Sequence, residues 1–285
     1  MDYLYQASLH HENKNYKEAI KYYLLALEQE VNIDLLLELS LCYFDNNEEN
    51  KALETLHKMI LLDEKFPSTY YVLGMIYEKK DLNKSLSYYQ KCLNLDPTYY
   101  QASYNLALLY EEINLNKAKE YYYQTLEIYD KHFWSLVNLS SILEQENNDQ
   151  EALKYLKQAL LIKEDAICLF NLGVIYKKLG DLKQAKNFYQ KAITVDKPYI
   201  YAYLNYALLY KAEGNLSEAI KIYSLGLEYE ENDILRYNRA CCFALLKKYK
   251  EAYNDLVIAI KDNKDLQAYM HYDQELTEVI TLYGL

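Results

Sequence analysis

Small and large apolar residues alternate along the whole chain with a fixed long period. A small residue is followed four positions later by a large one, so both lie on one face of a helix. The pair recurs every 33 or 34 residues. The small members are Ala19, Ala52, Ser85, Ala118, Ala152, Ala185, Ala219 and Ala252, and their large partners are Tyr23, Leu56, Tyr89, Tyr122, Leu156, Tyr189, Tyr223 and Leu256.

A second pattern with the same period precedes seven of these eight helices. A small residue is followed three positions later by a large one, at Ser40, Gly74, Ala107, Ser140, Gly173, Ala207 and Ala240. Short polar turns such as Gly180-Asp181 separate the two patterns, and Asp96-Pro97 marks the end of a second helix, because proline cannot continue it. The chain therefore reads as eight helix–turn–helix units.

These units predict an all-α fold, a right-handed α-solenoid with a C-terminal capping helix. One hairpin cannot bury its apolar face, but stacked hairpins share a continuous core. No Pro/Gly/Ser-rich linker interrupts the repeat, so we expect a single solenoid over residues 1–285. The approximate units are 1–32, 33–66, 67–99, 100–132, 133–165, 166–199, 200–232 and 233–264, with a cap at 265–285. In the cap, Asp273 is a candidate N-cap before Leu276, Val279 and Ile280.

The clearest unit is FNLGVIYKKLGDLKQAKNFYQKAITVDKP, residues 170–198. It resembles the tetratricopeptide repeat family, and the resemblance covers nearly the whole chain. Gln6 and His10 depart from it, because large apolar residues are expected there, and they leave the register of the first unit open. The resemblance implies a superhelix whose first helices line a concave groove. It also implies protein–protein recognition as the usual role, without naming a partner.

Helix geometry indicates which residues face that groove. At 100° per residue, the side opposite the core carries asparagine in five consecutive units. An amide side chain offers both a donor and an acceptor, so it can pair with an extended peptide backbone. Apolar side chains and one lysine share this outward side. The predicted peptide-binding residues are Asn105, Asn138, Asn171, Asn205, Asn238, Trp134, Ile167, Val174, Lys178, Tyr201 and Leu208.

Each of these assignments has a structural alternative. The asparagines either contact a ligand or bond locally, and the apolar groups either form a binding surface or pack against the neighbouring unit. A lysine clamp for a C-terminal carboxylate, as in the chaperone-binding members of the family, is rejected. The sites one turn before the asparagines would need lysine, and they are Gln101, Trp134, Ile167, Tyr201 and Ile234.

Charge and composition limit the class of partner and the cellular compartment that we expect. The net charge is −11, and all of the excess acidity lies in residues 1–150, which argues against a nucleic-acid partner. No apolar run approaches a membrane span, and no secretory signal is visible at the start, so we expect a cytoplasmic protein. The five cysteines lie inside helical patterns without a CxxC spacing and read as reduced core residues. By repeat position Cys242 is core, whereas Cys241 faces the groove.

The remaining motifs give no catalytic centre. Arg239 stands at a core position and is expected to pair with Asp255 on the following helix, because a partly buried charge needs a partner. The five histidines show no zinc-ligand spacing, and no phosphate-binding, dinucleotide or nucleophile-elbow motif is present, so we expect no cofactor and no metal.

The predicted function is a non-enzymatic scaffold or adaptor that binds a peptide or helix of a partner protein in the groove of units four to eight. Two alternatives stay open. One is a self-associating structural protein whose groove is filled by its own chain. The other is a substrate-recognition subunit of a separately encoded enzyme.

Overall fold

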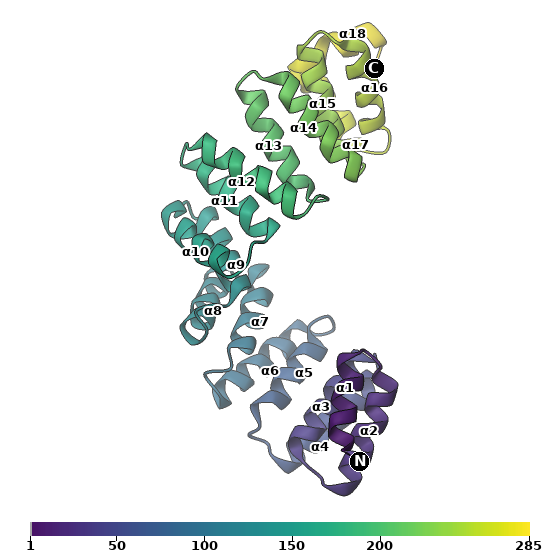
Figure 1. Cartoon of the computed structure of the whole chain (residues 1–285), viewed down its shortest axis with the longest axis vertical. Helices are drawn as coiled ribbons and strands as arrows, with labels where there is room; N and C mark the ends of the chain where they lie inside the picture. Colours follow the sequence, from purple (N-terminus) through teal and green to yellow (C-terminus); the bar gives the residue numbers. More distant parts are fainter. Residues whose placement is uncertain (1) are drawn as a thin grey trace. The chain divides into compact units, whose positions relative to one another are not determined.

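The computed structural model describes residues 2–285, and over this range the chain contains 18 α-helices, two short 3-10 helices and no strand. The expected fold class, an all-α solenoid of helical hairpins, is confirmed (Figure 1). The paired helices of hairpins one to eight are α1 Tyr3–Glu12 and α2 Tyr16–Gln29, α3 Ile33–Asp45 and α4 Glu49–Leu62, α5 Pro67–Tyr77 and α6 Leu82–Leu95, α7 Tyr100–Glu111 and α8 Leu115–Ile128, α9 Phe133–Gln145 and α10 Asp149–Ile162, α11 Ala166–Lys178 and α12 Leu182–Val195, α13 Ile200–Ala212 and α14 Leu216–Tyr229, α15 Asp233–Leu245 and α16 Tyr249–Ile260.

The chain divides into two compact units, Met1–Ser135 and Leu136–Leu285, and the division falls inside α9. Within the first unit, α2 packs on α3 and α6 on α7; within the second, α12 packs on α13 and α14 on α15. Within each unit, these second helices thus contact the first helix of the next hairpin, which is the contact that a stacked array needs to bury its apolar faces.

The two periodic patterns form the core, as the sequence predicts. All eight small residues of the second helices are fully buried, from Ala19 to Ala252, and their eight large partners are at most 1 % exposed. Close approach explains the glycines at small positions of the first helices. A Cβ atom added to Gly173 would lie 2.5 Å from Cε1 of Tyr189, and one added to Gly74 would lie 2.5 Å from Cε1 of Tyr89. Packing at this density leaves no room for a larger side chain.

The turns inside the hairpins come in two lengths. Six of them contain one residue with a positive φ, namely Lys14, Asn47, Asn147, Gly180, Gly214 and Lys247. Counted from the small core residue of the first helix to that of the second, the third and fourth hairpins are one residue shorter, and their turns contain no residue with a positive φ. There, Asp81 and Asn114 cap the second helix by accepting a hydrogen bond from the backbone N–H of Lys84 (3.1 Å) and Lys117 (3.2 Å).

The first hairpin has the repeat register, and its unusual polar residues are accommodated by ring contacts. Ala7 takes the small core position and is fully buried. His10 stacks on Tyr22 with ring centroids 5.4 Å apart, and Nε2 of His11 lies 2.9 Å from the Asp45 carboxylate of the next hairpin. The departures in sequence therefore leave the repeat geometry intact.

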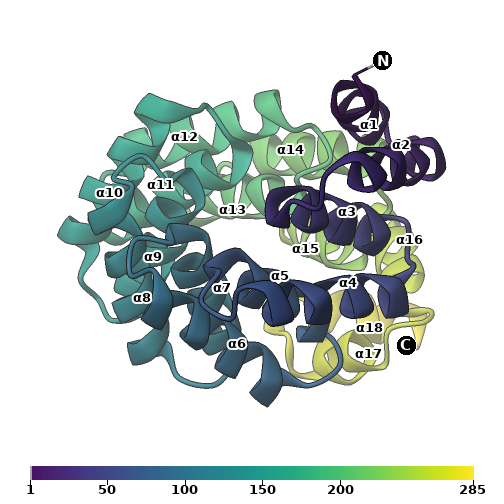
Figure 2. The same ribbon diagram turned by 90° about the horizontal axis from the view of Figure 1, so that it is seen from below.

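The C-terminal segment covers the end of the second unit. It consists of α17 Lys264–Tyr269, two 3-10 turns at Met270–Tyr272 and Gln274–Leu276, and α18 Thr277–Tyr283. These helices pack against α15 and α16, as Figure 1 and Figure 2 show in yellow. Met270, Leu276 and Val279 are buried there. Asp273 is an N-cap as predicted, accepting from the backbone N–H of Glu275 at 3.0 Å, although the turn that it caps is the 3-10 turn before α18.

Candidate functional site

The five asparagines of the predicted groove lie at one equivalent position on α7, α9, α11, α13 and α15, and all are partly exposed. In the first unit, Asn105 belongs to a network with the preceding hairpin. Its amide donates to the Tyr89 hydroxyl at 2.9 Å, and that hydroxyl donates in turn to the Glu78 carboxylate. This amide is thus engaged inside the protein.

In the second unit, one of these amides bonds to the preceding hairpin and two bond within their own helices. The side-chain N–H of Asn171 donates to Oγ of Ser141 (3.2 Å), whereas Asn205 and Asn238 donate to carbonyl oxygens of their own helices, those of Tyr201 (3.0 Å) and Ile234 (2.9 Å). Local bonding, one of the two alternatives left open by the sequence, therefore holds part of the Asn205 and Asn238 amides, and a contact with the preceding hairpin holds part of the Asn171 amide. These bonds leave the second N–H and the side-chain oxygen of each amide for other partners.

Asn205 and Asn238 bond to their own helices, whereas Asn105 bonds to a tyrosine of the preceding hairpin, and two tyrosine hydroxyls in the second unit are unsatisfied. Tyr189 and Tyr223 hold the position of Tyr89 in the sixth and seventh hairpins, and their hydroxyls are buried without a hydrogen-bond partner among residues 2–285. Burial raises the pKa of both phenols above the usual range. A buried hydroxyl without a partner destabilises the fold relative to a bonded one.

We therefore expect Tyr89→Phe and Tyr189→Phe to change the free energy of unfolding by different amounts. The first removes hydrogen bonds with Asn105 and Glu78 and is expected to lower the free energy of unfolding by about 1–2 kcal/mol. The second removes a hydroxyl without a partner and is expected to be neutral or stabilising. Urea unfolding followed by circular dichroism measures both, and an equal loss in the two variants would contradict the assignment.

The apolar residues of the predicted site vary in exposure. In the second unit, Ile167, Tyr201 and Ile234 stand in the first turn of α11, α13 and α15, and all three are exposed. Val174 and Leu208 lie further along α11 and α13 and are half-buried. Trp134, in the first unit, is 38 % exposed and lies edge-on against the Phe133 ring at 5.0 Å.

Two lysines near this face, the predicted Lys178 and also Lys211, already have acidic partners. Lys178 forms ion pairs with Glu144 (2.8 Å) and Asp149 (3.3 Å) of the preceding hairpin, and the Glu144 carboxylate raises its pKa above the usual value. Lys211 forms an ion pair with Glu275 of the C-terminal segment. Any acidic partner would have to compete with these carboxylates.

The C-terminal segment also covers the outward face of α15. The Tyr237 hydroxyl donates to Oδ2 of Asp273 at 3.0 Å, and Sγ of Cys241 lies 3.6 Å from the same oxygen. The prediction that Cys241 faces an open groove is wrong, because this residue is only 1 % exposed beneath the segment. Sequence reasoning expected a cap on the last hairpin but gave no signal that Glu275 reaches back to Lys211 on α13.

The same place holds a cluster of ligand-type atoms. The Cys241 thiol and the carboxylates of Asp273 and Glu275 lie within 4.8 Å of one another. The Lys211 ammonium group already supplies positive charge to Glu275, and burial raises the pKa of the Cys241 thiol, which keeps it protonated. The cluster is thus satisfied internally by an ion pair and hydrogen bonds.

The other cysteines are inert core residues. Burial raises the pKa values of Cys42, Cys92 and Cys168 to about 12 and that of Cys242 to about 11. A nucleophilic cysteine needs a lowered pKa and access to solvent, and these thiols have neither.

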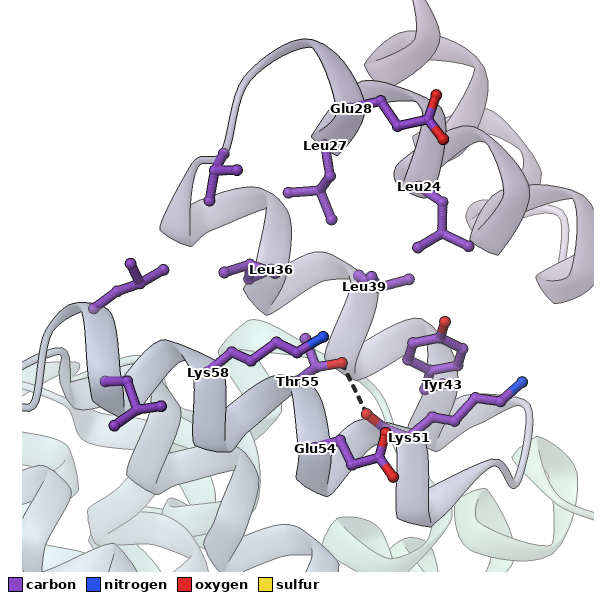
Figure 3. A pocket seen from close by; sticks show the side chains of 13 residues that line it. Leu24, Leu27, Glu28, Leu36, Leu39, Tyr43, Lys51, Glu54, Thr55 and Lys58 are labelled. Atoms are coloured by element: carbon purple, nitrogen blue, oxygen red, sulfur yellow. Dashed lines mark hydrogen bonds between the residues drawn. The ribbon is translucent and has the colours of Figure 1, made fainter.

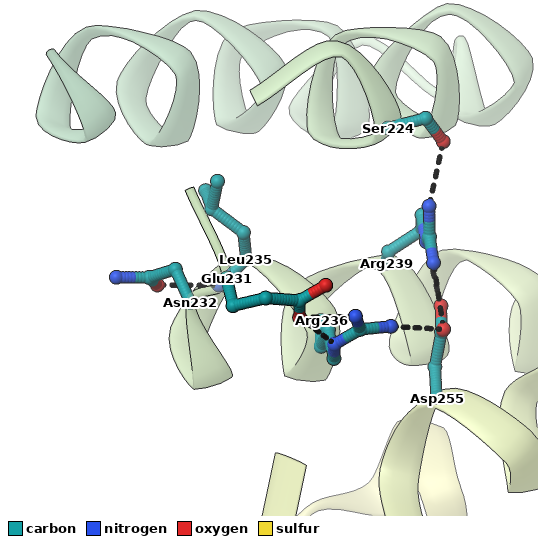
Figure 4. A network of polar contacts seen from close by, with 7 residues as sticks. All are labelled: Ser224, Glu231, Asn232, Leu235, Arg236, Arg239 and Asp255. Atoms are coloured by element: carbon teal, nitrogen blue, oxygen red, sulfur yellow. Dashed lines mark hydrogen bonds and ion pairs between the residues drawn. The ribbon is translucent and has the colours of Figure 1, made fainter. Parts of the chain in front are cut away.

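The pair predicted from Arg239 is present and extends into a network (Figure 4). Nε and Nη2 of Arg239 donate to the two carboxylate oxygens of Asp255 at 2.6 and 2.7 Å, and Nη1 donates to Oγ of Ser224 at 2.9 Å. Arg236 approaches the same carboxylate at 3.7 Å and also pairs with Glu231. This bidentate geometry indicates a structural role inside the eighth hairpin.

Comparison with known sequences gives the family. Six segments match the family described as Tetratricopeptide repeat, and together they cover more than half of the chain; they are residues 3–30, 67–99, 101–132, 135–166, 166–198 and 200–233. The chain belongs to the tetratricopeptide repeat family. Members of this family are protein-interaction scaffolds. No helix within residues 2–285 is both long and apolar enough to cross a membrane.

Several individual proteins are similar to this tetratricopeptide repeat chain. The photosystem I assembly protein Ycf3 of Prochlorococcus marinus (strain MIT 9301) is 38 % identical over 72 residues, which are 24 % of this chain and 42 % of that protein. The match thus spans less than half the length of this relative. Among solved structures, MamA has a TM-score of 0.52 at 26 % identity and covers 55 % of this chain and 94 % of its own. PilF of Pseudomonas aeruginosa has a TM-score of 0.60 at 20 % identity, with coverages of 74 % and 99 %.

Proposed function

We propose that this tetratricopeptide repeat protein is a non-enzymatic scaffold that holds an extended segment of a partner protein against the first helices of the unit Leu136–Leu285. The observation that carries the proposal is the face shared by α11 and α13. There, partly exposed asparagine amides alternate with exposed apolar side chains such as Ile167 and Tyr201. Exposed apolar surface interleaved with hydrogen-bonding groups is typical of peptide-binding surfaces.

Each type of side chain has a distinct role in this proposal. The side-chain oxygens of the asparagines accept hydrogen bonds from peptide N–H groups, while the N–H bonds to Ser141 and Tyr201 hold the amides in place. The apolar residues Ile167, Val174, Tyr201 and Leu208 bury side chains of the peptide. Pre-positioned groups of this kind reduce the entropic cost of binding.

The residues at its two ends limit the proposed peptide-binding surface. Asn138 begins it on α9, and Lys178 keeps its ion pair with Glu144 beside it. At the other end, Asn238 borders a pocket whose other walls include the tail residues Tyr269 and Asp273. The proposed peptide therefore lies mainly on the sixth and seventh hairpins. Asn105 and Trp134 lie in the first unit, and their part in binding stays a prediction.

Replacing Asn171 and Asn205 together by alanine tests the proposal. Each lost hydrogen bond is expected to weaken binding by about 0.5–1.5 kcal/mol, so the double variant should bind a selected peptide about tenfold or more weakly. The peptide is chosen from an array probed with the full chain, and its affinity is measured by fluorescence anisotropy. Asn187→Ala, an exposed asparagine on α12, is the matched control and should leave the affinity unchanged. Equal affinity in the double variant would reject the asparagine contacts.

A second candidate function has an observation of its own. The C-terminal segment already binds the outward face of α15 and the Lys211 side chain of α13, so this surface does accept a segment of the same sequence. If segments were exchanged between copies, the protein would self-associate. Sedimentation velocity at increasing concentration separates the two functions, because a monomer at all concentrations excludes exchange.

A further inference from the structure

A large apolar pocket lies on the unit Met1–Ser135. Its volume is about 760 Å³, and it opens between α2 and α4, with α3 as its floor (Figure 3). We call it the α2–α4 pocket. Its residues are Leu24, Leu27, Glu28, Val31, Leu36, Leu39, Tyr43, Lys51, Glu54, Thr55, Lys58, Leu61 and Leu62.

Ring pairs fill the corresponding place in other hairpins of the same chain. There, an aromatic residue on the second helix packs on a ring of the first helix, with centroids 5.3 to 5.6 Å apart. Three of the four pairs are nearly parallel, with interplanar angles of 5° to 9°. The pairs are His10 with Tyr22, Tyr77 with Tyr88, Tyr110 with Tyr121, and Tyr176 with Phe188.

The second hairpin lacks this ring. The first-helix position is Tyr43, but the second-helix position is Thr55, whose hydroxyl donates to the carbonyl oxygen of Lys51 in its own helix. The Lys51 ammonium group lies 5.4 Å from the Tyr43 centroid, just as Lys84 lies 5.0 Å from Tyr77 and Lys117 lies 4.9 Å from Tyr110. Tyr43 therefore keeps the lysine contact of its counterparts but has no ring stacked on it.

The rim of the pocket is also unusually apolar. Leu24, Val31 and Leu61 line it and are 43 %, 68 % and 87 % exposed. Two of these positions differ in the next three hairpins: where Leu24 stands, they carry His57, Gln90 and Tyr123, and where Val31 stands, they carry Glu64, Pro97 and Asp130. Leaving such side chains in water costs free energy that a partner would recover.

We propose that the α2–α4 pocket receives one tyrosine or phenylalanine side chain from a segment of another protein. The ring takes the place that Tyr88, Tyr121 and Phe188 fill in their own hairpins and stacks on Tyr43. The rest of the volume accommodates aliphatic neighbours of that ring against Leu24, Val31 and Leu61. Two acids and two lysines share the pocket walls, so its charge is mixed and favours a partner segment without strong charge.

This interaction is independent of the proposed function. It uses the second helices α2 and α4 of the first unit, whereas peptide binding uses the first helices of the second unit. Variants of Thr55 should leave binding on α11 and α13 unchanged, and variants of Asn171 and Asn205 should leave the α2–α4 pocket unchanged. The failure of one proposal thus does not decide the other.

Thr55→Tyr tests the proposal by restoring the missing ring from within the chain. The first probe is p-cresol, which has the side chain of tyrosine, titrated into the full chain with methyl groups labelled for NMR. We expect shifts at Leu24, Val31 and Leu61 in the wild type and none in Thr55→Tyr. Leu61→Ala should weaken p-cresol binding at least threefold. Leu161→Ala, which removes an equally exposed leucine of the fifth hairpin (88 %), should not change it.

The second probe is a displayed library of twelve-residue peptides. It is selected for binding to the full wild-type chain, and the binding of the selected peptides to Thr55→Tyr is then compared. We expect the enriched peptides to carry tyrosine or phenylalanine and to bind Thr55→Tyr at least tenfold more weakly. If Thr55→Tyr folds poorly, Leu24→Ala takes its place as the test. It changes an exposed side chain of the pocket and should reduce the same binding. Peptides without an aromatic residue, equal binding to Thr55→Tyr, or no response to either probe would overturn the proposal. A dimer that Thr55→Tyr abolishes would also overturn it, because the occupant would then be a second copy.

Discussion

Asp255→Ala is expected to lower the free energy of unfolding by about 3–5 kcal/mol, the usual cost of removing one partner from a buried ion pair. Asp255 is 5 % exposed and accepts both guanidinium bonds of Arg239, while Arg236 lies 3.7 Å away. Without the carboxylate, the Arg239 charge stays inside the eighth hairpin, where the Ser224 hydroxyl and the Phe243 ring at 6.0 Å do not neutralise it. Urea unfolding, followed by both circular dichroism and Trp134 fluorescence, measures the loss.

A double variant separates charge from packing. In the sixth hairpin the positions of Arg239 and Asp255 are held by Leu172 and Phe188, so Arg239→Leu with Asp255→Phe copies an arrangement that the chain already uses. Replacing both partners by apolar residues removes the buried charges together and should recover most of the stability. A single variant that loses less than about 1 kcal/mol would show that the pair is weakly coupled to the fold.

Tyr189→Ala is expected to lower the free energy of unfolding by about 3–5 kcal/mol, as large-to-small changes of buried aromatic residues do. The Tyr189 ring is fully buried in the second unit and fills the space beside Gly173. Its removal leaves a cavity that neighbouring helices cannot close without moving. Thermal and urea unfolding both report the change.

Two further variants serve as controls for this effect. Tyr272→Ala removes a tyrosine that is 84 % exposed and should change stability by less than about 0.5 kcal/mol. Tyr189→Leu combined with Gly173→Ala imitates the eighth hairpin, where Ala240 stands beside Leu256, and should recover part of the loss. If Tyr189→Ala were no more harmful than Tyr272→Ala, the small–large pairing would not be a main source of stability.

The sequence was sufficient to predict the hairpins and their core. Each small position, such as Ala185, is followed four residues later by a large one, such as Tyr189, and seven residues later by a small or flexible one, such as Ala192. Spacings of four and seven together fit one face of a helix, whereas residues seven apart lie on opposite faces of a strand. The period of 33 or 34 residues repeats this constraint eight times. The polar pair Arg239–Asp255 was also predictable, because a charge at a core position requires a partner.

The hydrogen bonds and the covering of the candidate site could not be predicted from the sequence. Helix geometry gives the direction of Asn205 and Asn238, but it does not show that their amides fold back onto carbonyl oxygens of Tyr201 and Ile234. It also does not show which chain segment covers Cys241, because the 64-residue separation of Lys211 and Glu275 lies outside any local pattern. Such contacts depend on how distant elements pack.

The α2–α4 pocket was only partly predictable from the sequence. The substitution that creates it is visible in the printed sequence, since Thr55 stands where other hairpins carry Tyr22, Tyr88 or Phe188. The pattern of small and large core residues does not include this position, so the difference has no meaning until ring pairs are seen in neighbouring hairpins. A comparison of repeats position by position would have identified it.

The ion pair between Lys211 and Glu275 has a consequence for biosynthesis. A chain emerging from the ribosome can fold its early hairpins one after another, because each needs only its neighbour. The Lys211 side chain of α13 differs, since its partner Glu275 is translated 64 residues later, after the whole eighth hairpin. Until the C-terminal segment has been translated, the Lys211 ammonium group lacks this carboxylate, so the ion pair is among the last contacts that a growing chain can form.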